Sequence, residues 1–199
     1  MFADLPDAVA ARMRELAEVD ERDRDDGTPQ ARRLRQIPPE TGQFLAILCA
    51  SAPPGEVIEI GASAGYSALW LSLACRATGR HLETYEVDPA KVALARETFA
   101  LTRVDDVVDL IEGDFRAVTA LDPQPVGFCF LDAEKDVYDD CYDLVVPRLV
   151  SGGLLVCDNV ISHADALGAL VDRAEADDRV DSVVVPIGKG ELLVRRRGA

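Results

Sequence analysis

The stretch VIEIGASAGYS, residues 57–67, constrains the fold most, because a short apolar run stops at a glycine and a helical pattern starts soon after it. The apolar residues before Gly61 predict a buried strand. From Tyr66 onward apolar residues cover almost every side of a predicted helix, as expected for a helix packed on a sheet. Gly61 and Gly65 permit backbone angles or close approaches that a side chain would block. We therefore expect strand, tight turn and helix, with the backbone N–H groups of the turn facing a ligand.

The acids around this turn indicate which ligand binds. The glycine spacing is G-x-x-x-G, not the G-x-G-x-x-G of dinucleotide-binding proteins, so a pyrophosphate is disfavoured. Glu59 is placed to meet an amine, and Glu86, at the tip of a second predicted strand, is placed to accept both hydroxyl groups of a ribose. Together these features favour S-adenosylmethionine. The alternatives are that Glu59 is a surface acid at a strand edge and that Glu86 is a solvated loop carboxylate.

The charge balance limits the partners of the chain. The sequence has 36 acids against 21 bases, a formal net charge of −15, and its lysines are Lys91, Lys135 and Lys189. Such a surface repels nucleic acid and anionic membranes at long range, which favours a small-molecule substrate. The excess of Asp over Lys is typical of adaptation to high salt, but a GC-rich coding bias gives the same preference for arginine.

Length and composition favour one soluble domain over residues 1–199, with a helical arm and cap at 1–52 and an α/β core at 53–199. No apolar run approaches the roughly 20 residues that span a bilayer, and the start lacks a basic and then apolar signal region, so we expect a cytoplasmic protein. The number of cysteines, five, is odd, and no C-x-x-C occurs. We therefore expect single core cysteines, without a disulfide framework or zinc site.

Helical and strand patterns alternate along the chain. An amphipathic helix is expected at 5–20, then a charged, solvated linker at 20–27, and a second helix from the prolines at 38–39. The predicted strands are 56–60, 81–87, 107–112, 126–132, 153–158, 181–187 and 191–196; the predicted helices lie near 66–77, 89–101, 137–149 and 163–176. This order predicts a seven-stranded, mostly parallel sheet with helices on both faces and an antiparallel C-terminal hairpin.

Oxygen-bearing side chains follow two strands that should be neighbours. Asp132 ends the strand 126–132, and Asp158 and Asn159 end the strand 153–158. Ligands collect beyond the carboxyl ends of such strands, and close carboxylates repel one another without a cation. This donor set suits Mg²⁺, Mn²⁺ or Ca²⁺ better than zinc. The alternative is that Asp158 and Asn159 only cap the turn after their strand.

Four motifs in one order, EIGASAGYS, YEVD, LDAEKDVY and CDNVI, resemble those of the cation-dependent O-methyltransferases, the group of catechol and caffeoyl-CoA O-methyltransferases and their bacterial relatives. The resemblance covers about residues 35–195, and RQIPPETGQFL resembles the segment in which the residue at Ile37 contacts the cofactor through its backbone. It implies a Rossmann-like class I methyltransferase that acts on a small aromatic substrate with vicinal hydroxyl groups.

The resemblance also implies roles for individual residues. The cofactor S-adenosylmethionine would be bound by Ile37, Glu59, Gly61, Ala62, Ser67, Glu86, Asp114, Phe115 and Asp132. Asp132, Asp158 and Asn159 would hold the divalent cation, Mg²⁺ before Mn²⁺ or Ca²⁺, and Lys135 would be the catalytic base. A cation favours the phenolate of a catechol, whose hydroxyl has a pKa near 10, and the oxygen then attacks the sulfonium methyl in line.

Other functions remain open at this stage. A tRNA hydroxyuridine O-methyltransferase would need a basic surface near the pocket, for which Arg32, Arg33 and Arg35 are the candidates. A non-catalytic cofactor-binding protein is a further alternative. His163 would either touch the acceptor or start a helix, and the chain enters that helix without the longer acceptor-covering insertion of many relatives. The N-terminal arm would pack against a second subunit or over the cofactor, and we expect a homodimer.

Overall fold

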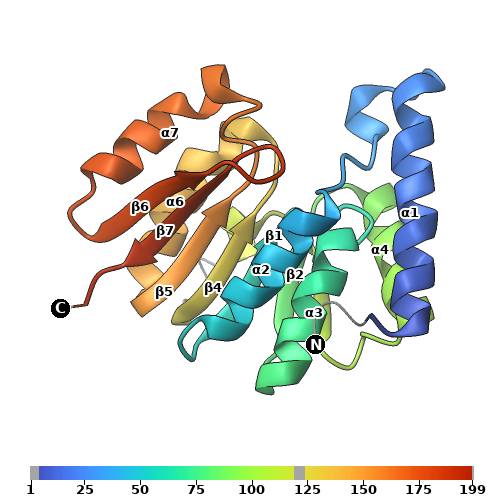
Figure 1. The fold of residues 1–199 in the computed structure, drawn as a ribbon, viewed down its shortest axis with the longest axis horizontal. Coiled ribbons are helices and arrows are strands. Elements are labelled where there is room, and N and C mark those ends of the chain that lie inside the picture. The colour runs from blue at the N-terminus through green and yellow to red at the C-terminus, as the bar shows by residue number, and fades with distance from the viewer. Residues whose placement is uncertain (1–4, 119–123, 199) are drawn as a thin grey trace.

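The computed structural model describes residues 5–118 and 124–198, which form a seven-stranded sheet with the order β3-β2-β1-β4-β5-β7-β6 (Figure 1). The strands are β1 (Glu56–Ile60), β2 (Leu82–Glu86), β3 (Val108–Glu112), β4 (Val126–Leu131), β5 (Leu149–Cys157), β6 (Val180–Val185) and β7 (Glu191–Arg196). All pairs from β3 to β5 are parallel, whereas β7 runs antiparallel to both β5 and β6. The predicted mostly parallel sheet with a C-terminal hairpin is confirmed.

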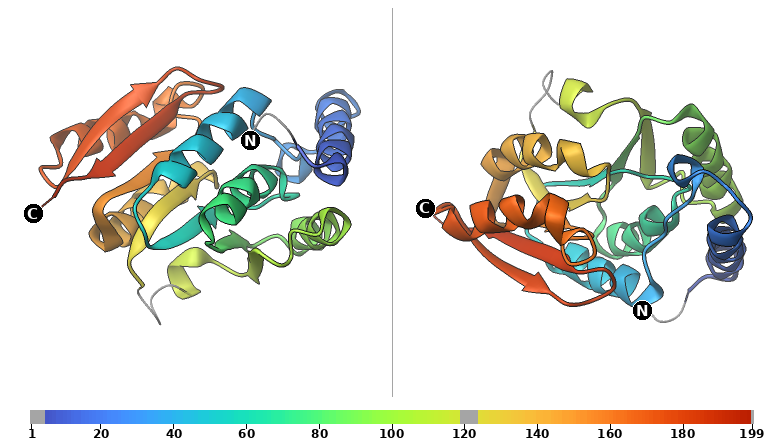
Figure 2. Two further views of the ribbon diagram at one scale, coloured as in Figure 1. Left: turned by 60° about the horizontal axis from the view of Figure 1, so that its bottom comes forward. Right: turned by 90° about the horizontal axis from the view of Figure 1, so that it is seen from above.

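Helices cover both faces of the sheet (Figure 2). They are α1 (Asp7–Asp25), α2 (Pro39–Ser51), α3 (Tyr66–Thr78), α4 (Pro89–Thr102), α5 (Phe115–Val118), α6 (Tyr138–Val145) and α7 (Ala164–Ala176), with 3₁₀ turns η1 (Gln30–Arg32), η2 (Lys135–Val137) and η3 (Val146–Arg148). Successive strand residues face opposite sides, so Val57 and Phe128 pack under α1–α4, and Ile58 and Cys129 pack under α6 and α7. Both faces of the central strands are therefore apolar, as in parallel sheets generally.

The strand register brings three chain segments to one point. Ile60 pairs with Leu131, and Leu131 pairs with Cys157. The ladder continues one residue further, because the Asp132 N–H donates to the Ile60 carbonyl at 3.0 Å and the Asp158 N–H donates to the Leu131 carbonyl at 3.0 Å. The neighbouring strand tips that the sequence predicted are thus confirmed. They lie where the strand order reverses, between β1 and β4, which is the usual ligand position in an open α/β sheet.

The start of β5 differs from the prediction. The sequence placed a helix up to residue 149 and a strand from 153, but the strand begins at Leu149 and contains a glycine pair. Gly152 has φ +80°, and the pairing with β4 shifts register between Val126 and Phe128. The glycines therefore form a bulge inside one strand, where the sequence indicated a break between two elements.

The charged segment after residue 20 also differs from the prediction, because it is helical and partly buried. Helix α1 continues to Asp25, and the Asp20 and Asp23 side chains are each only 6% exposed. Asp23 accepts the backbone N–H of Leu34 at 2.8 Å, and Asp20 accepts that of Gln36 at 3.1 Å. The expected solvated linker is wrong, since these acids hold the chain that returns toward the sheet.

The apolar face of α1 is covered within the chain. Val9, Met13 and Leu16 are buried in the core cluster that also holds residues of α3 and α4.

No helix within the described residues is long and apolar enough to cross a membrane. All five cysteines are buried free thiols, as the sequence predicted.

Candidate functional site

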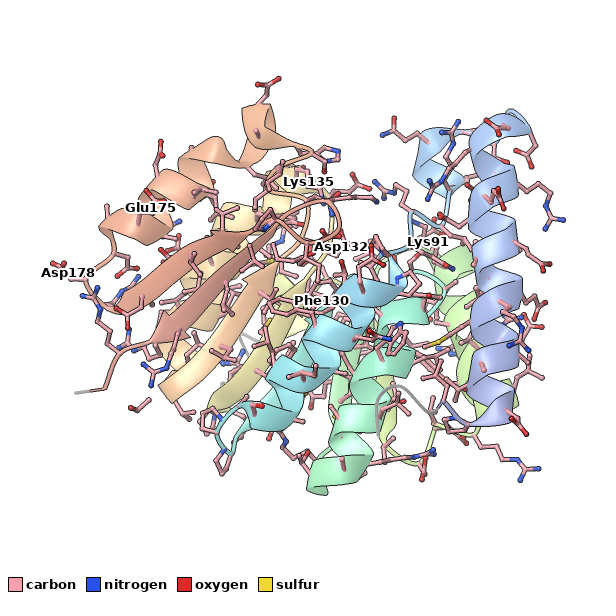
Figure 3. All side chains as sticks on the ribbon, in the orientation of Figure 1. Lys91, Phe130, Asp132, Lys135, Glu175 and Asp178 are labelled. Carbon is pink, nitrogen blue, oxygen red and sulfur yellow. The ribbon has the colours of Figure 1, made fainter. Side chains whose placement is uncertain are left out.

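A cavity of about 430 Å³ lies over the carboxyl ends of the central strands. All but two of the predicted site residues line it, namely Ile37, Gly61, Ala62, Ser67, Glu86, Asp114, Phe115, Asp132, Lys135 and Asn159. Its wall is completed by the segment before α2 and by the turn between β6 and β7. In the view of Figure 3, Asp132 lies above Phe130 of the sheet, between Lys135 and Lys91. Glu59 and Asp158 do not reach the cavity wall.

Both glycines of the turn after β1 are required by close packing. Gly61 has φ +105°, and a Cβ atom there would lie 2.1 Å from the carbonyl oxygen of Asp132. Gly65 has φ +86°, and its Cβ would lie 2.6 Å from Cε1 of Phe99. The close approaches inferred from the sequence are present: the turn after β1 lies against the tip of β4, and the start of α3 lies against α4.

The backbone N–H groups of this turn are used inside the protein. The Gly61 and Ala62 N–H groups donate to the Tyr85 carbonyl at 2.9 and 3.0 Å, and the Ser63 N–H donates to Oε2 of Glu86 at 2.7 Å. The expectation that these donors face a ligand is therefore wrong. They tie the turn to the end of β2, and so they fix the position of Glu86.

Glu86 is a rigid acid at the cavity wall. It is 8% exposed, and its Oε1 accepts the backbone N–H groups of Val87 and Asp88, each at 2.9 Å. A solvated loop carboxylate, the alternative raised by the sequence, does not fit this burial. Three backbone donors hold the carboxylate in one orientation, with lone pairs left for a ligand.

Glu59 lies deeper than the cavity and is fully buried. The Thr84 hydroxyl donates to its Oε2, and hydrogen bonding by the Ser67 side chain also favours its ionised form. Burial raises the pKa of Glu59 to about 7. The alternative of a surface acid at a strand edge is therefore wrong. Ser67, at the start of α3, lines the cavity wall in its place.

The far end of the cavity, beyond β2 and β3, is aromatic. Phe115 is 2% exposed and packs edge-on against Tyr85, with ring centroids 5.1 Å apart and an interplanar angle of 82°. Asp114 pairs with Arg116 at 2.7 Å, and this contact holds the pKa of Asp114 below its ordinary value. Phe115 and Tyr85 both line the cavity, so this end offers an aromatic wall that suits contact with a flat ring such as a purine.

Polar side chains meet at the tips of β4 and β5. Asn159 donates its Nδ2 to Oδ1 of Asp132 at 3.2 Å, and Lys135 donates its Nζ to the same oxygen at 3.3 Å. Lys135 also donates to the Ala133 carbonyl and to the Tyr138 hydroxyl, each at 2.9 Å. Three acceptors therefore fix the Lys135 amine beside Asp132.

Asp158 lies behind this group and is 1% exposed. Its Oδ1 accepts the Asn159 N–H at 2.6 Å, and its carboxyl group meets the carboxyl group of Glu191, with which it shares a hydrogen bond. Burial, and then repulsion from Asp132, raises the pKa of Asp158. Asn159 has φ +74°, so the backbone turns sharply directly after Asp158.

Glu191, the first residue of β7, was not predicted as a site residue. It is fully buried beside Asp158, and burial followed by repulsion from Asp158 raises the pKa of Glu191. An acid at the start of a strand next to a glycine turn looks solvent-facing in the sequence. Only the antiparallel register, in which Leu192 pairs with Cys157, brings Glu191 beside Asp158.

The donor set at these tips fits a hard cation. Asp132 and Asp158 repel each other, and the buried Oδ2 of Asp158 meets no N–H or hydroxyl donor among the described residues, so it is an oxygen that a cation would satisfy. Within residues 5–118 and 124–198 no group of three or more His, Cys, Asp or Glu side chains is placed to hold a metal. A cation here would therefore rest on two carboxylates, with the carboxamide of Asn159 as the third ligand.

The contacts of Arg35 and His163 bear on two further expectations from the sequence, a basic cluster for tRNA and a role for His163 at the acceptor. Arg35 has φ +53°, lines the cavity and forms an ion pair with Glu134, which lowers the pKa of that carboxyl. Arg35 is therefore not part of a free basic cluster. His163 precedes α7 and lines the cavity, with Nδ1 2.9 Å from the Ser162 hydroxyl.

Comparisons with known proteins match the chain to one family by sequence and to one fold by structure. The sequence profile described as O-methyltransferase matches residues 12–197. A catechol O-methyltransferase of Niastella koreensis is 30% identical, and the match covers 81% of this chain and 69% of that protein. A catechol O-methyltransferase of Mycobacterium tuberculosis is 29% identical, and the match covers 70% of this chain and 60% of that protein. Among solved structures, a Podospora anserina methyltransferase bound to S-adenosylhomocysteine is 23% identical, with a TM-score of 0.81, over 98% of this chain and 89% of that one.

Proposed function

This chain belongs to the family of S-adenosylmethionine-dependent O-methyltransferases, and we propose that it uses a divalent cation and methylates a small acceptor with vicinal hydroxyl groups on an aromatic ring. One observation carries the proposal. Lys135 and Asn159 both donate to Oδ1 of Asp132 at the wall of the cavity, and the carboxylate of Asp158 lies behind this group. Oxygen ligands beside an amine suit the binding and deprotonation of a hydroxyl pair.

The residues of the chain divide into three tasks. Glu86 and the aromatic surface of Phe115 would hold the ribose and the purine of the cofactor, and Glu59 lies below as the acid for its amine. Asp132, Asp158 and Asn159 would hold the cation. When bound, such a cation supplies positive charge that favours the phenolate form of the acceptor.

Proton transfer falls to Lys135. Its Nζ lies 3.3 Å from Oδ1 of Asp132, so an acceptor hydroxyl bound beside this carboxylate is close to the amine. Holding the acceptor oxygen in line with the sulfonium methyl then supplies much of the rate.

The homodimer stays a prediction. The N-terminal arm, helix α1, is left out of the predicted contact because its apolar face is covered within the chain.

The test is formation of S-adenosylhomocysteine from S-adenosylmethionine and catechol, with Mg²⁺ and again with excess chelator. We expect turnover to vanish with chelator and to fall at least about 100-fold in Asp158→Asn, because the substitution removes one of the two carboxylates proposed for the cation. Asp178→Asn, which removes an exposed acid far along the chain, is the matched control. Mn²⁺ binding measured by electron paramagnetic resonance adds a readout that does not depend on turnover.

Turnover that chelator leaves unchanged would refute the cation mechanism. The tRNA alternative is less favoured, because Arg35 is paired with Glu134 and Arg33 donates to the Thr28 carbonyl at 2.9 Å. Methylation of hydroxyuridine in tRNA, with no activity on any catechol, would favour it instead. A non-catalytic role would require the side chains at the strand tips to serve no reaction, and binding of the cofactor without any transfer would support that role.

A further inference from the structure

Lysine is rare in this chain and is found at the cavity. Lys91, Lys135 and Lys189 are the lysines of a sequence with 36 acids and 21 bases, and each of them lines the cavity. Elsewhere the positive charges are arginines. A cavity that carries the lysines of so acidic a chain offers positive charge to a ligand that the rest of the surface would repel.

Lys189 is held in a fixed place by its backbone. It stands between Gly188, with φ +54°, and Gly190, with φ +95°, in the turn from β6 to β7. A Cβ atom on Gly188 would lie 2.3 Å from Oγ1 of Thr41, and one on Gly190 would lie 2.3 Å from Cγ1 of Ile161. The turn is thus packed on both sides, between α2 and the loop after β5.

The same turn is bonded to the loop that follows Asn159. The Lys189 carbonyl accepts the N–H groups of Ile161 and Ser162 at 3.2 and 3.0 Å. Lys189 therefore lies at the acceptor end of the cavity, next to the residues proposed for the cation. Lys91, in the first turn of α4 after β2, lies at the cofactor end.

Apart from Lys91 at the cofactor end, the other lysine and arginine side chains that line the cavity already have partners among the described residues. Lys135 donates to Asp132, Arg35 pairs with Glu134, and Arg116 pairs with Asp114. The half-buried Lys189 side chain has no hydrogen bond or ion pair with any residue that the structure describes. An ammonium group on a rigid turn at the acceptor end, without a hydrogen bond to any described residue, is suited to bind an anionic group of the ligand.

We propose that Lys189 binds a carboxylate on the acceptor, so that the preferred substrates are vicinal dihydroxy aromatic acids and not uncharged catechols. This inference rests on the proposed function. A competing role for Lys189 is that of a counter-charge for Asp158, whose ionised form it favours. The two roles differ in what they predict, because a counter-charge affects every acceptor equally, whereas a carboxylate contact affects only acidic acceptors.

The experiment compares catechol with 3,4-dihydroxybenzoate in the full-length protein with Mg²⁺. We expect wild type to have the lower KM for the acid, and Lys189→Met to raise that KM about five- to tenfold, with kcat and the catechol KM unchanged. Lys189→Arg should retain the preference. Arg14→Met, which removes an exposed positive charge from α1, controls for net charge. Binding of 3,4-dihydroxybenzoate to the Mg²⁺ and S-adenosylhomocysteine complex, measured by calorimetry, should weaken by the same factor.

The outcomes separate this inference from the proposed function. Equal losses on both acceptors in Lys189→Met would assign Lys189 to the counter-charge role and overturn the carboxylate contact. Turnover of catechol with no preference for the acid in wild type would overturn the inference and leave the proposed function standing. Absence of turnover on both acceptors, with cofactor bound, would overturn the two together.

Discussion

Replacing Glu59 with glutamine should stabilise the ligand-free protein at neutral and alkaline pH. Glu59 is fully buried, and its pKa rises from 4.5 to about 7 because burial outweighs the hydrogen bonds of Ser67 and Thr84. At pH 8 the folded protein must therefore ionise a carboxyl in an apolar place. A shift of this size corresponds to about 3 kcal/mol of lost stability. Glutamine keeps the shape and the bond from Thr84, and it carries no charge.

The sign follows from proton binding. Below the unfolded pKa of 4.5, Glu59 is protonated in both states and costs nothing. Between 4.5 and about 7 the folded state holds a proton that the unfolded state has released, so the stability of wild type falls as pH rises through this window. Above about 7 the loss is complete. The difference between Glu59→Gln and wild type should therefore grow from under about 1 kcal/mol near pH 5 to about 3 kcal/mol at pH 8.

Urea unfolding of the two proteins at pH 5, 6, 7 and 8, without ligand, measures this difference. Other titrating groups, including Asp158 and Glu191, are present in both proteins and cancel in the comparison. A gap that does not change with pH, or that narrows as pH rises, would refute the reasoning. S-Adenosylhomocysteine carries the amine that we assign to Glu59, so it should raise the stability of wild type more than that of the variant.

Two further substitutions test the packing around the site. Gly61→Ala should lower the free energy of unfolding by more than about 3 kcal/mol, because it combines a left-handed backbone with a Cβ atom 2.1 Å from a carbonyl oxygen. Gly79→Ala, with φ +66° and open space around the Cβ position, should lower it by only about 1 kcal/mol. Thermal unfolding of the two variants measures the difference. Asp23→Ala should cost about 1–3 kcal/mol in urea unfolding, because the Leu34 N–H loses its acceptor, and an equal loss in the exposed Asp25→Ala would contradict this explanation.

Local patterns were sufficient for the sheet and for most of the site. Parallel strands buried on both faces are continuous apolar runs, and the register then brings Asp132 and Asp158 to adjacent tips without further information. Gly61 was identified as a place of close approach because a glycine directly after a buried strand has few other uses. The bulge at Gly152 was missed because a glycine pair inside a strand has the same local signal as a turn.

The errors concern acids whose partners lie far along the chain. Asp20 and Asp23 belong to a charged run that resembles a solvated linker, yet they accept backbone N–H groups from residues 34 and 36. Glu191 stands at the start of a strand, and its neighbour Asp158 is 33 positions away in sequence. Periodicity measures which side of an element is apolar, but it carries no information on which distant group a buried carboxylate meets.

The buried acids share a physical consequence for ligand binding. Glu59 and Asp158 both have pKa values raised by burial, and neither lines the cavity, although both lie next to residues that do. Each one destabilises the ligand-free fold at neutral pH, because burial penalises its ionised form more than the nearby groups favour it. The ligands that we propose for these two places, an ammonium group and a divalent cation, both carry positive charge. Binding should therefore recover stability that the empty site loses, and ligand stabilisation should grow as pH rises from 5 to 8.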